Sequence, residues 1–554
     1  MKEIKEIKEL NKLLSKYVDD GFFPGIQWQI NIDNNQYSGK YGFNNIEKQE
    51  KVLDNSLYRV WSMTKPIVAV AALQLIEENK INLSDPITAY LPEFNDLQVL
   101  KRENGNIEDV EKISEYPTIK DLFLHTAGFS YNFLADPVGK EYDQLRLFNS
   151  DTTSLDQEIK ELNKLLSKYV DDGFFPGIQW QINIDNNQYS GKYGCNNIET
   201  QEKVLDNSLY RIWSMTKPII AVAALQLIEE NKINLSDPIT AYLPEFNDLQ
   251  VLKREDGNIE DVEKIIEYPT IKDLFLHTAG FSYNFLADPV GKEYDQLRLF
   301  NSDTTSLDQE IKILAKAPLL FKPNTSWRYS ISMDVLARII EIVSGDSLQN
   351  ILQQKIFNPL NMKDTGFTVS EENQNRVMVS YEFDPLKMKL TELISDPQKI
   401  GNYGYPLNIK TYARGGHGLF SSLSDYAIFA KMLHSGKSEQ GEQILNDQTL
   451  KLISSNFLEP KFFPIEIATI GIVKDENYVN GLEAYGWGLG CRTLLDPSKQ
   501  NNLGSVGEFG WAGAASTYFL VDNKKHLSAT IMTQVLFGNP DLAREFYTYI
   551  YSNF

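Results

Sequence analysis

The stretch EIKELNKLLSKYVDDGFFPGIQWQINIDNN begins at Glu6 and begins again at Glu158. The two copies keep a constant offset of 152 residues, the difference between 158 and 6, until the second LDQEIK, which starts at Leu307. Solenoid units are roughly 20 to 50 residues long, so this period is too long for a solenoid. We interpret it as a duplicated block followed by unique sequence over residues 313–554. The copies differ at six pairs of positions: Phe43 and Cys195, Lys48 and Thr200, Val60 and Ile212, Val68 and Ile220, Asn104 and Asp256, Ser114 and Ile266.

Composition and charge narrow the classes of protein that the chain can be. Its 554 residues are 42% hydrophobic and 12% aromatic, which is typical of a globular protein with substantial cores. A formal net charge of −21 disfavours nucleic acid and anionic lipid as partners. The sequence shows no apolar run of the ~20 residues that span a bilayer and no secretory signal at its N-terminus. With Cys195 and Cys491 as the only cysteines, we expect a reducing compartment, the cytoplasm.

Each copy of the block predicts only part of a sheet. A helix is followed by two strand-like runs, GIQWQINI and QYSGKYG, and then by an apolar helix, MTKPIIAVAALQLIEENK in the second copy. Further strand-like runs, YGWGLGCRTLL, ASTYFLVD and HLSATIMTQV, occur only near the C-terminus. A two-stranded hairpin is at best marginally stable by itself. We therefore expect residues 1–157 to be an incomplete N-terminal half-domain and residues 158–554 to form the complete domain.

The hexapeptide WSMTKP occurs in both copies, at residues 61–66 and 213–218. On a helix, Ser214 and Lys217 stand at i and i+3 and can reach each other. The ring of Pro218 would clash with the carbonyl four residues back unless Ser214 lies at the helix start, where free N–H groups can stabilise an oxyanion. S-x-x-K recurs by chance about once in 250 residues, so by this motif alone a capping serine and a surface lysine are the simpler interpretation.

Three later segments add candidate residues. Tyr329 in WRYS comes just before an amphipathic helix that ends at Gly345. The loop GGHGLFSS contains His417 and leads into a helix that Ser424 or Asp425 could cap. In GWAGAAST, small residues precede a β-prone run, and small residues at a strand edge let a ligand approach the backbone closely.

In this order, the segments SMTK, HTAG, WRYS, GGHGLFSS and GWAGAAST resemble the motifs of the serine hydrolases of the class C β-lactamase and penicillin-binding-protein superfamily. They are most similar to its esterase-like branch, and the resemblance runs from about Glu158 to the C-terminus. It implies a β-lactamase/transpeptidase-like fold of mixed α/β class. That fold is an antiparallel sheet flanked by helices, with a helical subdomain inserted between its N- and C-terminal strands.

The resemblance also implies roles for individual residues. Ser214 matches the acylated nucleophile, Lys217 the lysine beside it, and Tyr329 the tyrosine that acts with the lysine as general base. Trp511-Ala512-Gly513 occupies the position of the lactamase K-T-G motif, so the Ala514 N–H would join the Ser214 N–H in an oxyanion hole. No Ser-His-Asp arrangement is apparent, which leaves Lys217, Tyr329 or both as the base that activates the serine.

Two departures from the family pattern bear on the substrate. The asparagine of the Y-x-N motif is replaced by Ile331, and the lysine of K-T-G is replaced by Trp511. A pocket without these groups loses its hydrogen bond to a substrate amide and its cation for a β-lactam carboxylate. The sequence therefore favours a carboxylesterase for small or apolar acyl groups, with Trp511, Gly513 and His417 as substrate-binding residues. For His417, a satisfied loop histidine is an equal alternative, and β-lactamase or D-amino-acid peptidase activity also stays open.

The last expectations concern the first copy and the binding partners of the protein. Ser62 and Lys65 have no counterpart of Tyr329 or Ala514 in their own copy, so we expect that copy to be inert by itself. Its unpaired strands and apolar surface would favour a homo-oligomer or a domain-swapped dimer. We expect a small ester or amide as substrate, no cofactor, no metal, no nucleic acid and no membrane. The alternative is a non-catalytic scaffold that uses the same fold.

Overall fold

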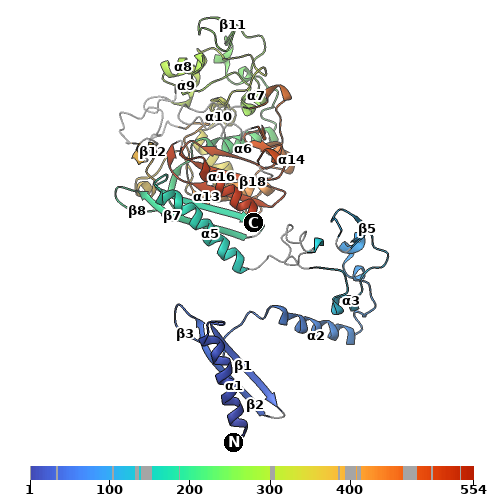
Figure 1. Ribbon diagram of the computed structural model, residues 1–554. Coiled ribbons are helices and arrows are strands. Elements are labelled where there is room, and N and C mark those ends of the chain that lie inside the picture. Colours follow the sequence, from blue (N-terminus) through green and yellow to red (C-terminus); the bar gives the residue numbers. More distant parts are fainter. Residues whose placement is uncertain are drawn as a thin grey trace. The chain divides into compact units, whose positions relative to one another are not determined.

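The computed structural model divides the chain into two compact units, Met1–Asp151 and Thr152–Phe554 (Figure 1). The described residues are 2–32, 35–102, 105–130, 136–138, 152–185, 187–299, 306–384, 387, 389–393, 407, 413–465, 483–500, 503–536 and 538–554. The second unit begins with helix α5 (Thr152–Asp171), so the division falls slightly before the predicted boundary at residues 157 and 158. None of the described helices is long and apolar enough to cross a bilayer.

The second unit is built on an eight-stranded antiparallel sheet of order β15-β16-β17-β18-β19-β6-β7-β8. Strands from opposite ends of the unit meet at its centre, where β19 pairs with β6 from Leu527 opposite Ile184 to Met532 opposite Gln179. This arrangement confirms the predicted antiparallel sheet, in which C-terminal strands complete a sheet begun by N-terminal ones. The strands are β6 (Gly177–Ile184), β7 (Asn187–Asn197), β8 (Glu202–Lys203), β15 (Tyr485–Trp487), β16 (Arg492–Leu494), β17 (Phe509–Gly513), β18 (Thr517–Asp522) and β19 (Leu527–Met532).

Helices cover both faces of this sheet, because successive side chains of a strand point to opposite faces. On β18, Leu520 packs in one core with α5 and with α16 (Asp541–Asn553), whereas Phe519 and Val521 belong to the larger core on the other face. In Figure 1, α5 and α16 lie in front of the sheet. The larger core contains α6 (Thr216–Glu229), α10 (Ser332–Ser344) and α13 (Leu423–Ser435).

A largely helical region is inserted between the N-terminal and C-terminal strands, as predicted. Its further helices are α7 (Ile271–Leu276), α8 (Pro289–Gln296), α9 (Leu307–Leu314), α11 (Leu348–Leu352), α12 (Asn358–Leu360) and α14 (Asp447–Ser454). Its short helical turns are η4 (Trp213–Met215), η5 (Ile239–Ala241), η6 (Pro244–Phe246), η7 (Gln353–Phe357), η8 (Glu371–Arg376) and η9 (Pro460–Phe462), and η10 (Pro497–Gln500) follows later. Its strands are β9 (Leu209–Arg211), β10 (Gln250–Leu252), β11 (Val262–Lys264), β12 (Tyr381–Asp384), β13 (Lys389–Glu392) and β14 (Phe420–Ser422), and β20 (Val535–Leu536) pairs with β12.

Three local predictions need correction. The run YGWGLGCRTLL forms two short strands, β15 and β16, because the backbone turns at Gly490 with a positive φ of 106°. The small-residue segment before β18 is itself a strand, β17. Helix α13 is capped by Ser422, whose hydroxyl accepts a hydrogen bond from the Asp425 N–H, and not by Ser424 or Asp425.

In its described part, the first unit contains the local elements of residues 158–282 except a counterpart of β9, which pairs with β14 in the second unit. They are α1 (Lys2–Asp19), β1 (Gly25–Ile32), β2 (Asn35–Asn45), β3 (Glu50–Lys51), η1 (Trp61–Met63), α2 (Thr64–Glu77), η2 (Ile87–Ala89), η3 (Pro92–Asp96), β4 (Gln98–Leu100), β5 (Val110–Lys112) and α3 (Ile119–Leu124). Among its described residues, the larger sheet has three strands, in the order β1-β2-β3, and no residue of α2 is buried. In the second unit, 11 of the 14 residues of the matching helix α6 are buried.

Candidate active site

Ser214 lies in the short turn η4, immediately before helix α6 begins at Thr216. This position confirms the inference from Pro218, because the turn of α-helix that the proline ring would obstruct does not form. Trp213 just before the serine has a positive φ of 45°, a conformation that non-glycine residues rarely adopt. The Tyr426 hydroxyl donates to the Met215 carbonyl at 2.8 Å and holds the turn against α13. The serine is thus presented on a constrained turn.

Lys217 is a buried amine that contacts the serine directly. Its Nζ donates to Ser214 Oγ at 3.1 Å and to the Gly416 carbonyl at 2.7 Å, and the residue is 1% exposed. Burial lowers the pKa of Lys217 to about 7, although the nearby Asp334 carboxylate opposes this shift. A lysine with this pKa is unprotonated in about half of the molecules at neutral pH, which makes it a competent base.

Tyr329 approaches the same serine from the loop before α10. Its hydroxyl forms a hydrogen bond with the Ser214 side chain and accepts another from Trp511 Nε1 at 3.0 Å. The aromatic ring of Tyr329 lies 4.7 Å from Lys217 Nζ. Burial raises the pKa of Tyr329 above its usual value, so the phenol keeps its proton at neutral pH. The structure therefore brings Ser214, Lys217 and Tyr329 together.

Two further residues at this site were not found by sequence reasoning. Asp334 is buried in the first turn of α10, and burial raises the pKa of its carboxyl group, whereas Lys217 lowers it. Tyr283 is also buried, and its ring lies 5.3 Å from Lys217 Nζ and 5.7 Å from the ring of Tyr329. An acidic residue among the apolar residues of SMDVLARII was the available signal for Asp334. Tyr283 follows HTAGF in the repeat and carries no separate signal.

The two histidines of the motifs are near the serine but are engaged elsewhere. His277 ends α7 with a positive φ, and its Nδ1 accepts the Ser330 N–H at 3.2 Å. His417 is half-buried, and its ring stacks on Trp213 with centroids 5.9 Å apart. Burial and the charge of Lys217 hold the pKa of both imidazoles well below the usual value, so both rings are neutral at pH 7.

Strand β17 brings the predicted oxyanion and substrate residues to the serine. A Cβ on Gly513 would lie 2.5 Å from the carbonyl oxygen of Ile212, so glycine is required where the strand passes the turn that bears Ser214. Ala514 follows β17 directly. Trp511, on the same strand, is 6% exposed and packs edge-on against Trp487 with centroids 4.6 Å apart. Ile331, at the asparagine position of the family motif, is buried in the core.

A buried ion pair holds the GGHG loop in place. Arg414 binds Glu310 of α9 through Nε at 2.9 Å and through Nη2 at 2.9 Å, and both side chains are almost completely buried. One hydrogen bond from Nη2 and a second charge contact at Nε hold the guanidinium against the carboxylate. The pair therefore sets the position of the neighbouring Gly416 carbonyl, which accepts the hydrogen bond from Lys217. No local pattern in the sequence indicates this pair, because its partners are 104 residues apart.

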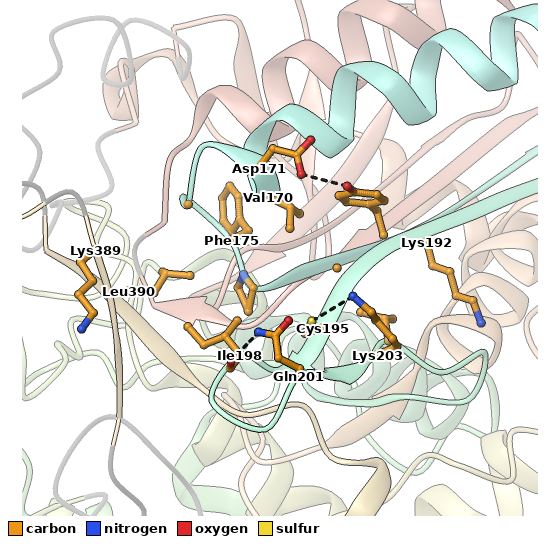
Figure 2. Close-up of a pocket in the computed structure, with 15 residues that line it drawn as sticks. Val170, Asp171, Phe175, Lys192, Cys195, Ile198, Gln201, Lys203, Lys389 and Leu390 are labelled. Atoms are coloured by element: carbon orange, nitrogen blue, oxygen red, sulfur yellow. Dashed lines mark hydrogen bonds between the residues drawn. The ribbon is translucent and has the colours of Figure 1, made fainter.

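A cavity in the described part of the second unit lies elsewhere. It measures about 670 Å³ and is lined by residues of the α5–β6 connection, β7, β8 and β13 (Figure 2). Cys195 lies in its wall and accepts a weak hydrogen bond from Lys203 Nζ at 3.7 Å (Figure 2). None of the predicted catalytic residues lines it. Among the described residues, no three His, Cys, Asp or Glu side chains are grouped to hold a metal ion.

The first unit repeats the serine–lysine pair without its surroundings. Lys65 Nζ donates to Ser62 Oγ at 3.0 Å, and Trp61 has a positive φ of 46°. Both Ser62 and Lys65 are exposed, whereas Lys217 is buried. The local turn geometry therefore depends on the short sequence, and the burial that lowers the pKa of Lys217 depends on the rest of the second unit.

A family model and two esterases are similar to this chain. A family model described as Beta-lactamase matches residues 10–161 and again residues 162–550. Esterase EstB of Burkholderia gladioli is 26% identical over 362 residues, which cover 63% of this chain and 83% of that protein. Lovastatin esterase of Penicillium rubens is 28% identical over 345 residues, which cover 59% of this chain and 80% of that protein.

Solved structures show the same fold. Simvastatin synthase (LovD) from Aspergillus terreus is similar with a TM-score of 0.60 at 21% identity, over 72% of this chain and 98% of that one. EstCE1, a hydrolase with promiscuous acyltransferase activity, is similar with a TM-score of 0.59 at 21% identity, over 72% of this chain and 99% of that one. These likenesses confirm the predicted β-lactamase/transpeptidase-like fold.

Proposed function

Because the chain belongs to the β-lactamase family, we propose that its second unit is a serine hydrolase that works through an acyl-enzyme, a carboxylesterase for small or apolar acyl groups. The observation that carries this proposal is the position of one hydroxyl between an amine and a phenol. Ser214 Oγ lies 3.1 Å from Lys217 Nζ and is hydrogen-bonded to Tyr329. A serine needs an adjacent base to become a useful nucleophile, and this site supplies one.

In the proposed acylation, unprotonated Lys217 takes the Ser214 proton as Oγ attacks the carbonyl carbon of the ester. Tyr329, a neutral phenol that already accepts a hydrogen bond from Trp511, has its own proton available for the leaving alkoxide. The proton held by Lys217 then restores the phenol, so the step releases one alcohol and leaves both groups as they began. Water completes the cycle by the same route and releases the acid.

The developing oxyanion would be stabilised by two backbone N–H groups, those of Ser214 and Ala514. This assignment is supported by the position of Ser214 just before α6 and by the close approach of Gly513 to Ile212. Removing one such donor from an oxyanion hole typically reduces kcat by about 10² to 10³.

The proposed preference for neutral esters is supported by the side chains around the serine. Trp511 lies where a β-lactamase has a lysine, and its indole N–H is already used by Tyr329. Rings of Tyr283, Tyr329 and Trp213 surround the serine–lysine pair, and His417, stacked on Trp213, is neutral. At the position where a β-lactamase lysine would bind a β-lactam carboxylate or a peptide C-terminus, the described residues offer an indole and not a cation to replace its hydration.

A fluorophosphonate probe with matched variants tests the nucleophile. We expect the probe to label Ser214 in the wild-type chain, most of the labelling and esterase activity to be lost in Ser214→Ala, and both to persist in Ser62→Ala. The two serines have the same neighbours in sequence, so the pair of variants controls for local effects. An unlabelled, inactive wild-type protein would instead favour the non-catalytic scaffold.

A substrate panel tests the acyl preference. We expect kcat/KM for p-nitrophenyl butyrate to exceed the values for nitrocefin and for D-Ala-D-Ala peptides, because only the ester lacks a carboxylate that needs a cation. A higher kcat/KM for nitrocefin or for the peptides would replace the esterase with a β-lactamase or a D-amino-acid peptidase.

We also propose the role of the first unit and the cellular context. We take residues 1–157 to be an incomplete half-domain, inert by itself, that favours self-association as a homo-oligomer or a domain-swapped dimer. Its exposed α2 supports this view. Cys195 and Cys491 are both free thiols, which supports a reducing compartment, the cytoplasm.

A further inference from the structure

The first unit exposes a face that the second unit buries. Ile67 of α2 is 68% exposed, whereas the equivalent Ile219 of α6 is fully buried. Trp61 and Met63 of the first unit are each 70% exposed, and the equivalent Met215 is buried. In the second unit this face packs in the core against α10 and other elements of residues 313–554. Patches of exposed large apolar side chains mark binding surfaces in soluble proteins.

The helix and hairpin that precede this face, α1, β1 and β2, are already folded as they are in the second unit. The indole of Trp28 donates to Asn11 at 3.1 Å, and that of Trp180 donates to Asn163 at 3.1 Å. The Tyr41 hydroxyl donates to Asp19 at 2.9 Å, matching the 2.9 Å bond from Tyr193 to Asp171. A surface that is ordered before binding loses little conformational entropy when it binds.

An open strand edge accompanies the apolar face. Strand β1 lies at the edge of its three-stranded sheet, and its sequence, GIQWQINI, is identical to that of β6. In the second unit β6 pairs on that side with β19. The same register would place Leu527 opposite Ile32 and Met532 opposite Gln27. An unpaired edge is a template for a further strand.

We infer that the first unit is a docking surface for residues 313–554 of a second copy of this chain. The docked segment would bring its Tyr329 and Trp511 to Ser62 and Lys65 and complete a second hydrolase site, so this inference rests on the proposed function. The occupant is a second copy of this chain, because its β19 pairs with β6, and β1 repeats the sequence of β6. For this, residues 313–554 of the donor chain must separate from the N-terminal copy with which they are paired. Two chains contain four N-terminal copies and two C-terminal segments, so two N-terminal copies are always left over.

Sequence differences between the two copies determine how strongly residues 313–554 prefer the second copy over the first. Ile212 and Ile220 are fully buried in the second unit, and the first unit has Val60 and Val68 in their places. Each missing methylene should favour the original pairing roughly two- to twelve-fold. Phe43 replaces Cys195, which lines the 670 Å³ cavity (Figure 2), so the larger ring has open space there. The second site is thus a minor one.

Complementation between two full-length variants tests the docking. The acceptor, Ser214→Ala/Tyr329→Phe, keeps Ser62 but has no phenol. The donor, Ile67→Asp/Ile219→Asp, keeps Tyr329 but has a charge in the apolar face of both N-terminal copies. We expect neither variant to react with fluorophosphonate when refolded from denaturant by itself. When the two are refolded together, we expect Ser62 of the acceptor to be labelled, and mass spectrometry distinguishes its peptide because Val60 and Val68 replace isoleucines.

The matched control is the acceptor Ser62→Ala/Tyr329→Phe, which offers Ser214 to the same donor. We expect labelling of Ser214 there, faster than labelling of Ser62 by roughly 5- to 160-fold for two methylenes. Labelling of Ser214 but not of Ser62 would overturn the docking surface, and labelling of neither would overturn exchange between chains. The wild-type chain is labelled at Ser214 in both cases, and its failure to react would refute the proposed function instead.

Discussion

At the scale of single residues, burial gives the site its chemistry. Lys217 and Tyr329 are pushed toward their neutral forms, because burial lowers the pKa of the amine to about 7 and raises that of the phenol. A neutral amine can accept a proton and a neutral phenol can donate one, so the two sides of Ser214 carry opposite functions. Asp334 opposes this trend at the amine, since its charge favours the ammonium form.

The pH dependence of the esterase should report this balance. We expect kcat/KM to rise with pH through an apparent pKa of about 7, because only unprotonated Lys217 can act as the base. Asp334→Asn removes a negative charge that favours the ammonium, so the acid limb should move to lower pH. The measurement is kcat/KM for a p-nitrophenyl ester between pH 5 and 9. An acid limb that stays in place in Asp334→Asn would contradict the proposed coupling.

A separate prediction concerns the phenol of Tyr329. Tyr329→Phe should reduce kcat/KM by about 10²- to 10⁴-fold, the range typical of general acid–base catalysis, because the leaving alkoxide loses its proton donor. Tyr294→Phe is the matched control, since Tyr294 is another buried tyrosine of the same unit. The rate of acylation by a chromogenic ester is the measurement. A rate for Tyr329→Phe equal to that of the control would remove the tyrosine from the mechanism.

At the scale of elements, the sequence predicts what depends on local pattern. The apolar helix that follows SMTK, the hairpin of β6 and β7, and the glycine stop of α10 were all predicted, because each follows from neighbouring residues. Strand β17 was not predicted as a strand, because its small residues have low β-propensity and its pairing with β18 stabilises it. Asp334 and the Arg414–Glu310 pair were missed for a related reason: their partners are distant in the chain.

The N-cap of α13 is another feature that the sequence alone did not identify, and it can be tested. Three serines, Ser421, Ser422 and Ser424, stand close together at the start of this helix, and the structure selects Ser422 as the cap. Ser422→Ala should lower the free energy of unfolding by about 1 kcal/mol, the usual cost of losing an N-cap. Ser424→Ala should cost less, because its side chain caps no helix end. Urea denaturation of both variants is the measurement, and a larger loss in Ser424→Ala would refute the assignment.

A second element, the C-terminal helix α16, is tied to the sheet through acidic residues. Tyr551 of α16 donates to Glu508 at 2.8 Å and contacts Asp522 at 3.2 Å, and burial raises the pKa of Glu508 to about 7. The folded state therefore holds a proton that the unfolded state releases above pH 4.5. Stability should fall as pH rises from about 4.5 to about 7, by at most about 1.4 kcal/mol per pH unit for this group.

Glu508→Gln isolates that contribution, because the amide keeps the shape of the acid without its charge. We expect a flatter dependence of the unfolding free energy on pH between 4.5 and 7 and a relative gain above pH 7. Some slope should remain, since burial also raises the pKa of Asp425, to about 6. Chemical denaturation at several pH values is the measurement, and an unchanged slope would show that Glu508 does not titrate in this range.

At the scale of the whole molecule, one amino-acid sequence occurs in two environments. The helix after SMTK is buried in the second unit and exposed in the first, although the two helices differ at a single residue, Val68 or Ile220.

A charge placed at equivalent positions of the two helices should therefore affect stability differently. Ile219→Asp puts an unpaired carboxylate in the core and should destabilise the second unit by more than about 3 kcal/mol. Ile67→Asp should leave the thermal unfolding of that unit unchanged, because Ile67 is largely exposed. The same change breaks an exposed apolar face, so Ile67→Asp should reduce self-association in light scattering across a range of protein concentrations. An Ile67→Asp variant that lowered the unfolding temperature as much as Ile219→Asp would place the first copy in the folded core. The assignment of that core to the second copy alone would then be wrong.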